Sequence, residues 1–402
     1  MKVSTQRFVD KWVGVPLCWL LSVAYGLKHG LLGRPSNASV QKILVVMLSE
    51  MGSLVLAYPM FQALRQRYPD AKIHTLMFAR NREVIDLLGL DIEVITVRDT
   101  GLLALLLDSF TAILRLRRSN FDVSLDCELF SRVSAIFCGL SGAAERVGFH
   151  RHTQEGLYRG DFFTRPVLYN PHQHIADQFL TLAHAIGSNS WPPAKLGHAP
   201  ASSYPRPSLR VEPSELAAAK AKLRELVPSA AKRELALLYV SGGALPIRAW
   251  PIAHFEQVAR AWVAQGYAVG IVGLPCDVAQ AMALVAAVNS EHCCNIAGQT
   301  SNVRELVLMF HHAKVLLAND GGPGHFAVLA DLPTVMLFGP ETPRLYGSLG
   351  QKVVHLHHAR MPCSPCLTAF NHRLSPCDGD NQCQKQISAK AALDAAHQLV
   401  GV

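Results

Sequence analysis

A glycine-rich turn after a short apolar run is the strongest sign of chemistry in this chain of 402 residues. The run Val315–Ala318 reads as a buried strand, and it leads into the sequence NDGGPGH at Asn319–His325, where a helix is predicted to begin. Glycines leave backbone amides uncovered, so a turn of this kind can hold the pyrophosphate group of a ligand. Such turns also occur for structural reasons alone, and the residues by themselves do not decide between the two.

A second group with chemical potential consists of four cysteines near the C-terminus, Cys363, Cys366, Cys377 and Cys383. Their number and compactness are typical of a tetrathiolate site, which would hold zinc or iron in a reduced compartment. We expect such a metal to support folding and to take no part in catalysis. Free thiols, or a disulfide formed on oxidation, are the alternative.

The longest motifs resemble one known family. The sequence LLANDGGPGHFA, followed by PTVMLFGPETPRLYG, is similar to the nucleotide-sugar site of the ADP-heptose:lipopolysaccharide heptosyltransferases, glycosyltransferase family 9. Lys42–Ile73 resembles the family's opening strand, loop and helix, and Leu237–Ala259 resembles the start of its second domain. The resemblance covers about residues 40 to 385 and implies an α/β protein of the GT-B fold, with two Rossmann-like domains that face each other across a cleft.

The same resemblance implies the activity. We expect an inverting glycosyltransferase, without a catalytic cofactor, that moves heptose from ADP-heptose to a lipopolysaccharide core or a related envelope glycan. A non-catalytic nucleotide-sugar-binding or assembly protein of the same fold is one alternative, and a nucleotide-sugar epimerase is another. A dehydrogenase is disfavoured because no GxGxxG follows a predicted strand.

Carried over position by position, the resemblance predicts a donor-binding site in the second half of the chain. Arg248 would make a charge-assisted contact with phosphate, although it could also be a surface cation. Asp277 would accept hydrogen bonds from the ribose or could cap a helix, and His325 would bind near the diphosphate or could serve only in packing. The predicted donor residues are Ser241, Gly242, Gly243, Arg248, Asp277, Asp320, Gly321, Gly322 and His325.

The first loop departs from the family's pattern. Where the better-known heptosyltransferases have an aspartate, which acts as general base, this chain has Ser53. Inverting transfer needs a group that removes the proton of the acceptor hydroxyl, and a serine cannot do this unaided. Glu50 in the same loop is the first substitute, and Asp126 and Glu128 near the end of a later strand are the others. A base elsewhere in the chain, or no catalysis, is the alternative, and Glu50 could also be a solvated loop charge or a cap partner at the helix N-terminus.

Arginines at predicted strand ends and loops of the first half could bind an anionic acceptor, such as a lipid-linked, phosphate-bearing saccharide. We expect about half of them to do so. These residues are Arg80, Arg82, Arg132, Arg146 and Arg151. The net charge of +8 suits a phosphate ligand or an anionic membrane surface, and we expect no nucleic-acid partner.

The elements that must position these residues form two series. With 50% hydrophobic and 17% charged residues the chain is too apolar to be disordered. Strand-like runs and helical patterns alternate over 40–187 and again over 215–358, which predicts two Rossmann-like domains. The resemblance implies that the first binds the acceptor and the second binds the nucleotide sugar. Among the predicted elements are the helices Leu54–Tyr68 and Leu102–Arg117 and the strands Ala268–Val272 and Thr334–Phe338. A proline-rich linker at 188–214 separates the two domains, and 359–402 is predicted to be a cysteine-rich loop with a C-terminal helix.

The N-terminal segment, residues 1–34, contains the apolar run Trp12–Leu27 with Trp19 and Tyr25, flanked by basic residues. The run is shorter than the roughly 20 residues that a spanning helix needs, and we expect it to lie in a membrane interface. A helix packed on its own domain or on a partner subunit is the alternative. Scattered cysteines typical of a reduced compartment indicate a cytoplasmic protein. With the membrane-interface segment, the resemblance implies a location peripheral to the inner face of the bacterial inner membrane.

Overall fold

The computed structural model describes residues 3–32, 39–48, 50–150, 157–189, 204–358, 360–371, 373–375 and 377–401. The chain divides into two compact units. The first consists of Met1–Asp86 and Leu90–Pro205, and the second of Leu87–Gly89 and Arg206–Val402. The change from one unit to the other after Pro205 lies inside the range 188–214 that we predicted for the linker, most of which is outside the described residues.

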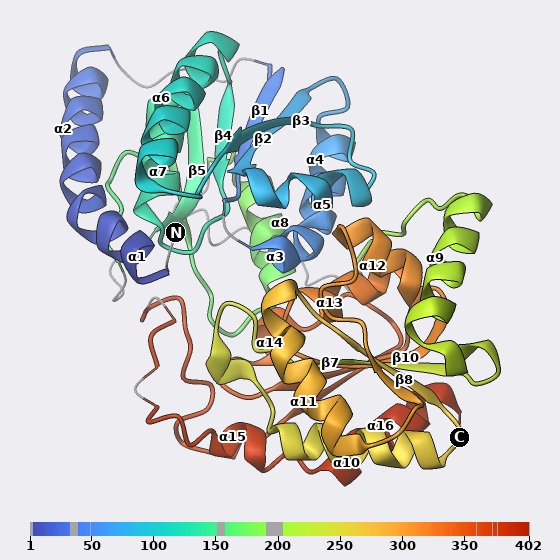
Figure 1. The fold of residues 1–402 in the computed structure, drawn as a ribbon. Helices are drawn as coiled ribbons and strands as arrows, with labels where there is room; N and C mark the ends of the chain where they lie inside the picture. The colour runs from blue at the N-terminus through green and yellow to red at the C-terminus, as the bar shows by residue number, and fades with distance from the viewer. Residues whose placement is uncertain are drawn as a thin grey trace. The chain divides into compact units, whose positions relative to one another are not determined.

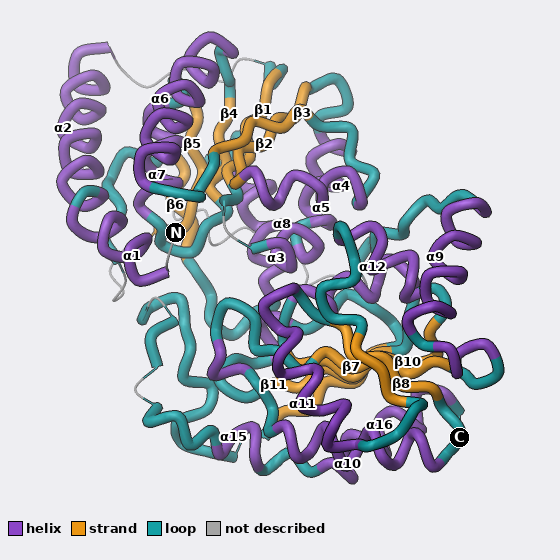
Figure 2. The backbone as a smooth tube through the Cα atoms, in the orientation of Figure 1, coloured by secondary structure: helices purple, strands orange, loops and turns teal. Residues whose placement is uncertain are grey.

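The first unit contains a parallel six-stranded sheet, drawn in orange in Figure 2. Its strands stand in the order β3-β2-β1-β4-β5-β6, which is the order of a Rossmann fold. The central strands are continuous apolar runs because helices cover both faces of such a sheet. The strands are β1 (Lys42–Val46), β2 (Lys72–Phe78), β3 (Glu93–Val97), β4 (Val123–Asp126), β5 (Glu145–His150) and β6 (Arg165–Leu168).

Helices flank this sheet on both faces (Figure 1). The predicted helix Leu54–Tyr68 is two helices, α3 (Met51–Leu56) and α4 (Tyr58–Arg67). They are separated at Ala57 because Pro59, which has no amide proton, can stand only in the first turn of a helix. The other helices that follow β2 in this unit are α5 (Arg82–Leu87), α6 (Leu102–Ser119), α7 (Arg132–Leu140) and α8 (Ile175–Ala185).

The second unit repeats the topology. Its six parallel strands stand in the order β12-β11-β10-β7-β8-β9, which is the same Rossmann order read from the other edge. Two of them, β8 and β11, have the bounds that the sequence predicted. The strands are β7 (Leu235–Tyr239), β8 (Ala268–Val272), β9 (Cys293–Asn295), β10 (Ala313–Asn319), β11 (Thr334–Phe338) and β12 (Val353–His357).

The helices of the second unit begin inside the predicted linker. The helix α9 starts at Pro213 and not after Ser214, because proline is well suited to the first helical position. A buried core joins β7, β8, β10 and β11 to α10, α11 and α16. The helices are α9 (Pro213–Leu226), α10 (Ile252–Ala264), α11 (Val278–Val288), α12 (Val303–Phe310), α13 (Gly322–Phe326), α14 (Pro343–Tyr346), α15 (Gln382–Lys385) and α16 (Ala389–Val400).

The N-terminal segment forms two helices, α1 (Val3–Trp12) and α2 (Gly14–Leu32), rather than one. Arg7–Lys28 is long and apolar enough to cross a membrane, so our expectation that the segment is too short to span was wrong as a matter of length. One face of the segment nevertheless packs on α7. The Asp10 carboxylate forms a buried ion pair with Arg132 at 2.9 Å, and the Tyr25 hydroxyl donates to the Gly139 carbonyl at 2.7 Å.

Candidate functional site

The donor-site candidates gather where the strand order of the second sheet reverses. From β7 the chain continues to β8 on one side, and from β10 it continues to β11 on the other side. In open parallel sheets, ligands bind at the carboxyl ends of the strands at such a point. The loop Val240–Gly243 follows β7, and Asp320–Gly322 follows β10. Two of the predicted groups, more than 70 residues apart in sequence, are therefore neighbours in the fold.

Asn319 ties these two loops together. Its side-chain amide donates to the carbonyls of Val240 at 2.9 Å and Ser241 at 3.2 Å, and its carbonyl oxygen accepts from the Trp250 amide at 3.0 Å. The residue is fully buried at the last position of β10. All polar atoms of its side chain are thus used to fix the backbone that surrounds the switch point.

The glycines leave little room for side chains. A Cβ at Gly242 would lie 2.8 Å from the Leu245 carbonyl oxygen, and Gly243 has a φ of +61°, which favours glycine. Gly321 and Gly322 are only partly buried, so their backbone remains accessible at the start of the short helix α13. Gly324, two residues further on, is buried against Met336, so the accessible part of the turn is limited to its beginning.

A buried cluster of charges lies under this backbone. Arg248 forms an ion pair with Glu341, and its Nε is 3.5 Å from the Asp320 Oδ2 atom. Glu341 also lies 3.2 Å from the Arg373 Nε atom, and the His325 Nε2 atom is 3.9 Å from the Asp320 Oδ1 atom. Because Arg248 is 8% exposed, the alternative that it is a surface cation is wrong.

Burial dominates the electrostatics of the cluster. It raises the pKa of Glu341 to about 7, and the nearby Asp320 carboxylate acts in the same direction, while Arg373 and Arg248 oppose the shift. The pKa of Tyr239, at the end of β7, is raised by burial to about 12, so this hydroxyl stays protonated. A guanidinium held between two carboxylates is fixed in direction, which is what recognition of a phosphate requires.

Asp277 lies in the loop that follows the neighbouring strand β8, as Asp320 lies in the loop that follows β10. Its Oδ2 atom accepts a hydrogen bond from the Leu274 amide at 2.8 Å, and the residue is 8% exposed. It stands at the N-cap position of α11 without a side-chain bond to that helix. The carboxylate therefore closes the turn before the helix, and ribose binding by this residue stays a prediction.

The base candidates stand at the switch point of the first sheet, at the ends of β1 and β4. Glu50 is the partly buried N-cap residue of α3, and Ser53 lies within that helix. Glu128 accepts a hydrogen bond from the Leu48 amide at 2.6 Å. Asp126 is fully buried, forms an ion pair with Arg159 and accepts from the Ser134 hydroxyl at 3.1 Å.

These surroundings rank the three carboxylates. The Asp126 oxygens bind groups of their own domain, and a base must reach a proton on the acceptor. Burial lowers the pKa of Arg159 to about 10, which leaves it cationic at neutral pH as the partner of Asp126. Glu50 and Glu128 are the better placed of the three, and the role of each stays a prediction.

The arginines predicted to bind the acceptor differ in exposure. Arg80 is half-exposed and pairs with Asp99 at 2.5 Å, and Arg82 is exposed at the start of α5. Arg132 is buried against Asp10, and Arg146 lies with its guanidinium carbon 3.9 Å from the Tyr25 ring centroid. Both of these hold the N-terminal helices on the domain, so Arg80 and Arg82 are the accessible candidates. Arg151 lies outside the described residues.

Comparison with known proteins gives the family. The model of glycosyltransferase family 9 (heptosyltransferase) matches residues 111–374, which is more than half of the chain. The chain belongs to glycosyltransferase family 9. The family 9 chain is 33% identical over 110 residues to lipopolysaccharide heptosyltransferase 2 of Salmonella typhimurium, which covers 27% of this chain and 31% of the relative. It is 24% identical over 333 residues to lipooligosaccharide heptosyltransferase 2 of Haemophilus ducreyi, covering 78% of this chain and 87% of the relative.

Among solved structures, the ADP-heptose lps heptosyltransferase II of Escherichia coli aligns with a TM-score of 0.69 at 20% identity. The alignment covers 90% of the family 9 chain and 98% of the other chain. At 20% identity, this structural similarity supports the assignment of the fold. Together with the two Rossmann sheets it confirms the predicted GT-B fold class.

The cysteine-rich segment of the family 9 chain touches the donor-site loops. The Gln384 amide donates to the Arg248 carbonyl at 2.7 Å, and the Ser364 hydroxyl donates to the Gly339 carbonyl at 2.7 Å. The Leu367 amide donates to the Pro340 carbonyl at 2.9 Å, next to Glu341. The segment therefore fixes the backbone on either side of the buried ion cluster.

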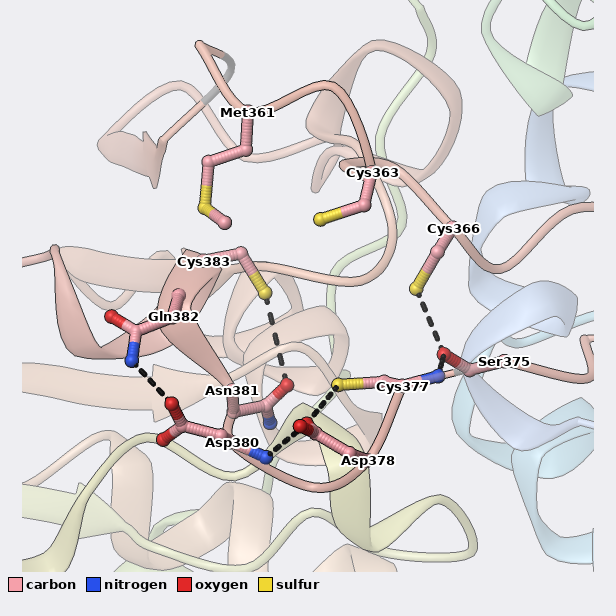
Figure 3. Close-up of a pocket in the computed structure, with 10 residues that line it drawn as sticks. All are labelled: Met361, Cys363, Cys366, Ser375, Cys377, Asp378, Asp380, Asn381, Gln382 and Cys383. Carbon is pink, nitrogen blue, oxygen red and sulfur yellow. Dashed lines mark hydrogen bonds between the residues drawn. The ribbon is translucent and has the colours of Figure 1, made fainter.

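The four cysteines line one cavity of about 320 Å³ in this segment (Figure 3). Cys366 lies 3.2 Å from the Ser375 hydroxyl, and the other three thiols also border the cavity. Within the described part of the chain, no three His, Cys, Asp or Glu side chains are arranged so that they could hold a metal ion. The donor set suits zinc or iron, but the thiols would have to move closer together to form a coordination shell.

The sequence motifs give no role to two charged residues of the cluster, Glu341 and Arg373. Glu341 lies in the motif LFGPETP, three positions after the end of β11, so its place in the loop at a strand end was a usable signal. Arg373 lies in the cysteine-rich segment, 32 positions further along the chain, and nothing in the local sequence indicates its partner. Tertiary contacts alone bring Arg373 to Glu341.

Proposed function

We propose that this chain is an inverting glycosyltransferase that moves heptose from ADP-heptose to a lipopolysaccharide core or a related envelope glycan. Family membership gives the class, and the names of its relatives, such as the ADP-heptose lps heptosyltransferase II, suggest the donor. One observation carries the proposal for this chain. A buried arginine, Arg248, is clamped by Asp320 and Glu341 beside the accessible backbone of Gly321 and Gly322.

In this proposal the second unit binds the donor. The diphosphate lies on the Gly321–Gly322 amides, and Arg248 neutralises charge that develops on the departing nucleoside diphosphate. Asp320 and Glu341 orient the guanidinium, so that little rearrangement is needed as the charge forms. An acceptor hydroxyl attacks the anomeric carbon from the opposite face, which inverts its configuration, and a carboxylate of the first unit takes the proton. Glu50 is the first candidate for that carboxylate.

The test is transfer from ADP-heptose to truncated core lipid by the wild type, Glu50→Gln and Ser53→Ala, with donor binding measured in parallel. We expect Glu50→Gln to lower the rate about 100-fold at nearly unchanged donor affinity, since general base catalysis typically contributes 10²–10⁴-fold. Ser53→Ala is the matched control from the same loop and should transfer at a rate close to that of the wild type. An unchanged rate for Glu50→Gln would remove this residue from the mechanism.

A second candidate function is a nucleotide-sugar-binding protein that does not catalyse transfer. Two observations favour it: Ser53 replaces the aspartate of better-known heptosyltransferases, and Asp126 is occupied by Arg159. This candidate predicts that the wild type binds ADP-heptose but neither transfers nor hydrolyses it with any core-lipid acceptor. Release of ADP that requires the acceptor would contradict it.

For the four cysteines we propose a structural zinc or iron ion. When bound, it would hold the segment 360–385 in place and would supply no step of the transfer. Metal analysis of protein purified without added metal, for the wild type and for Cys366→Ser/Cys383→Ser, tests this. About one equivalent of metal in the wild type that is lost in the variant supports the proposal, and metal-free wild-type protein of normal stability contradicts it.

We further propose that α1 and α2 attach the protein to the cytoplasmic face of the inner membrane, where a lipid-linked acceptor would be found. The face opposite α7 exposes Phe8, Trp12, Leu20 and Leu27, and the Lys11 ammonium lies 5.6 Å from the Trp12 ring centroid. This composition is typical of helices that lie in a membrane interface. Deleting the segment would leave Arg132 buried without Asp10, so substitutions on the exposed face are the better test.

A further inference from the structure

The helix α6 carries an exposed apolar face that the proposed function does not use. Leu105, Ala112 and Leu116 point into the core, as expected for an amphipathic helix. Other apolar side chains are between 42% and 71% exposed, and their positions repeat every three or four residues. They are Leu102, Leu103, Leu106, Leu107, Phe110 and Leu114. From the first to the last the face is about 18 Å long at 1.5 Å per residue.

A face of this kind does not serve the stability of the domain. Single exposed leucines are normal, but a continuous row of large apolar side chains on one helix marks a contact with something else. The row lies in the same unit as α1 and α2, and the two regions share a core: Cys18 of α2, Leu116 of α6 and Phe137 of α7 belong to one cluster. Both α2 and α6 pack against α7 and turn their other faces away from it.

The exposed charges on α1, α2 and α6 are mostly cationic, although the exposed Glu93 carboxylate lies 4.0 Å from the Arg115 guanidinium. Asp108 is the sole acidic residue of α6, and Arg98 holds it in an ion pair at 2.8 Å. The last turns of α6 carry Arg115, Arg117 and Arg118, all exposed. In α1 and α2 the one acidic residue, Asp10, is buried with Arg132. The exposed charges of these helices are therefore cationic, and they complement the headgroups of anionic phospholipids.

We infer that the exposed face of α6 is a second membrane-docking surface, which binds anionic phospholipid bilayers together with α1 and α2. Leucines and Phe110 enter the acyl boundary, and the three arginines reach the headgroups from the end of the helix. The inference rests on the proposed lipid-linked acceptor. A second copy of the chain is the other occupant of such a face, but its matching face would also be cationic and would offer Arg117 and Arg118 no complementary charge.

Vesicle co-sedimentation of the full-length protein tests the inference. The vesicles contain phosphatidylethanolamine with 30% phosphatidylglycerol, and phosphatidylcholine vesicles serve for comparison. The test variant is Leu106→Gln/Phe110→Gln on α6. The matched control is Ile252→Gln/Met282→Gln, which changes two exposed apolar side chains of the second unit. A third variant, Trp12→Ala/Leu20→Gln, alters the N-terminal helices.

We expect the α6 variant to bind the anionic vesicles about tenfold more weakly than the wild type, and the control to bind like the wild type. All four proteins should keep the same melting temperature and the same affinity for ADP-heptose, because the changed side chains are exposed. Sedimentation of the α6 variant equal to that of the wild type overturns the inference. Equal binding of the wild type to both kinds of vesicle does the same.

The oligomeric state of each protein in solution, measured by light scattering, tests whether a second copy of the chain occupies the exposed face of α6. A wild-type dimer that becomes a monomer in the α6 variant would assign this face to a second copy and overturn the inference. Failure of the proposed function has a different signature. The wild type would then bind anionic vesicles through α6 but transfer no heptose to a short, water-soluble core saccharide.

Discussion

The two Rossmann sheets have the same strand order but use their switch points differently. In the first unit, Asp126 at the end of β4 is fully buried in an ion pair with Arg159, and Glu128 binds the Leu48 amide. In the second unit, Asp320 at the end of β10 shares Arg248 with Glu341 beneath glycine backbone that remains accessible. Equivalent strand ends thus carry an internal tie in one unit and a candidate ligand site in the other.

The difference shows why a carboxylate at a strand end does not reveal its role by position. Both oxygens of Asp126 have partners within its own domain. Its Oδ2 atom pairs with Arg159 and accepts from the Ser134 hydroxyl, and its Oδ1 atom accepts from the Glu128 amide at 3.1 Å. Arg248 lies between two carboxylates, which fix the direction of its guanidinium near the accessible backbone of Gly321 and Gly322. We expect the first cluster to govern stability and the second to govern chemistry.

The largest effect is expected from breaking the cluster of the first unit. Arg159→Met leaves Asp126 buried without its cation, and we expect the free energy of unfolding to fall by about 3–5 kcal/mol. Urea unfolding followed by circular dichroism measures this. The double variant Arg159→Met/Asp126→Leu removes both charges and should recover part of the loss. A change below about 1 kcal/mol in the single variant would contradict the internal role of this pair.

Next in size is the effect of removing the arginine of the second unit. Arg248→Ala should lower kcat/KM for ADP-heptose about 100- to 1000-fold, because the group that stabilises developing negative charge is lost. Arg248→Lys keeps the charge but not the planar fork, so it should recover only part of the activity. Steady-state kinetics with both variants, checked for folding by circular dichroism, measure the effect. If Arg248→Ala had the same kcat/KM as the wild type, Arg248 would have no role in binding the donor phosphate.

The third and smaller effect is a pH dependence of stability, which arises from the ionisation of Glu341 in the cluster of the second unit. Burial raises its pKa from 4.5 to about 7, so between these values the folded state holds a proton that the unfolded state has released. The contribution of Glu341 to stability is therefore fully present below about pH 4.5 and is lost as the pH rises towards 7. Relative to Glu341→Gln, the wild type should lose at most about 3 kcal/mol over this range. Unfolding curves at several pH values check the sign, and parallel stability profiles would contradict it.

The sequence predicted the elements best where one local property decides them. The strands β8 and β11 are continuous apolar runs bounded by turns, and their predicted and observed bounds agree. In contrast, β5 has the sequence ERVGFH, in which a charged residue interrupts the apolar pattern of a buried strand. Arg146 can be buried there because it donates hydrogen bonds to the carbonyls of Phe162 and Ala143. Such a charge becomes acceptable only through contacts that arise after the chain has folded.

The residues of the candidate site were likewise predictable only where short stretches of sequence decide their positions. Motif positions located Arg248, Asp320 and the glycines, which depend on strand ends and turns within short stretches. The Arg373–Glu341 pair and the Arg159–Asp126 pair join residues 32 and 33 positions apart, so neither could be deduced from local spacing. The amphipathic pattern of α6 likewise predicted a helix, but only the fold shows that its second apolar face is exposed.

The smallest predicted effect separates a ligand-binding turn from a structural one. Gly321 and Gly101 are both N-cap residues with an extended backbone, at φ 174° and −164°, so alanine fits the backbone at either position. A Cβ at Gly321 would touch Tyr239 at 3.2 Å and would partly cover the amides that we assign to the diphosphate, whereas a Cβ at Gly101 meets nothing within 4 Å. We expect Gly321→Ala to raise the KM for ADP-heptose roughly tenfold, about 1.4 kcal/mol, and Gly101→Ala to leave it unchanged. Equal KM values for the two variants would mean that the glycine turn of the second unit only shapes the chain.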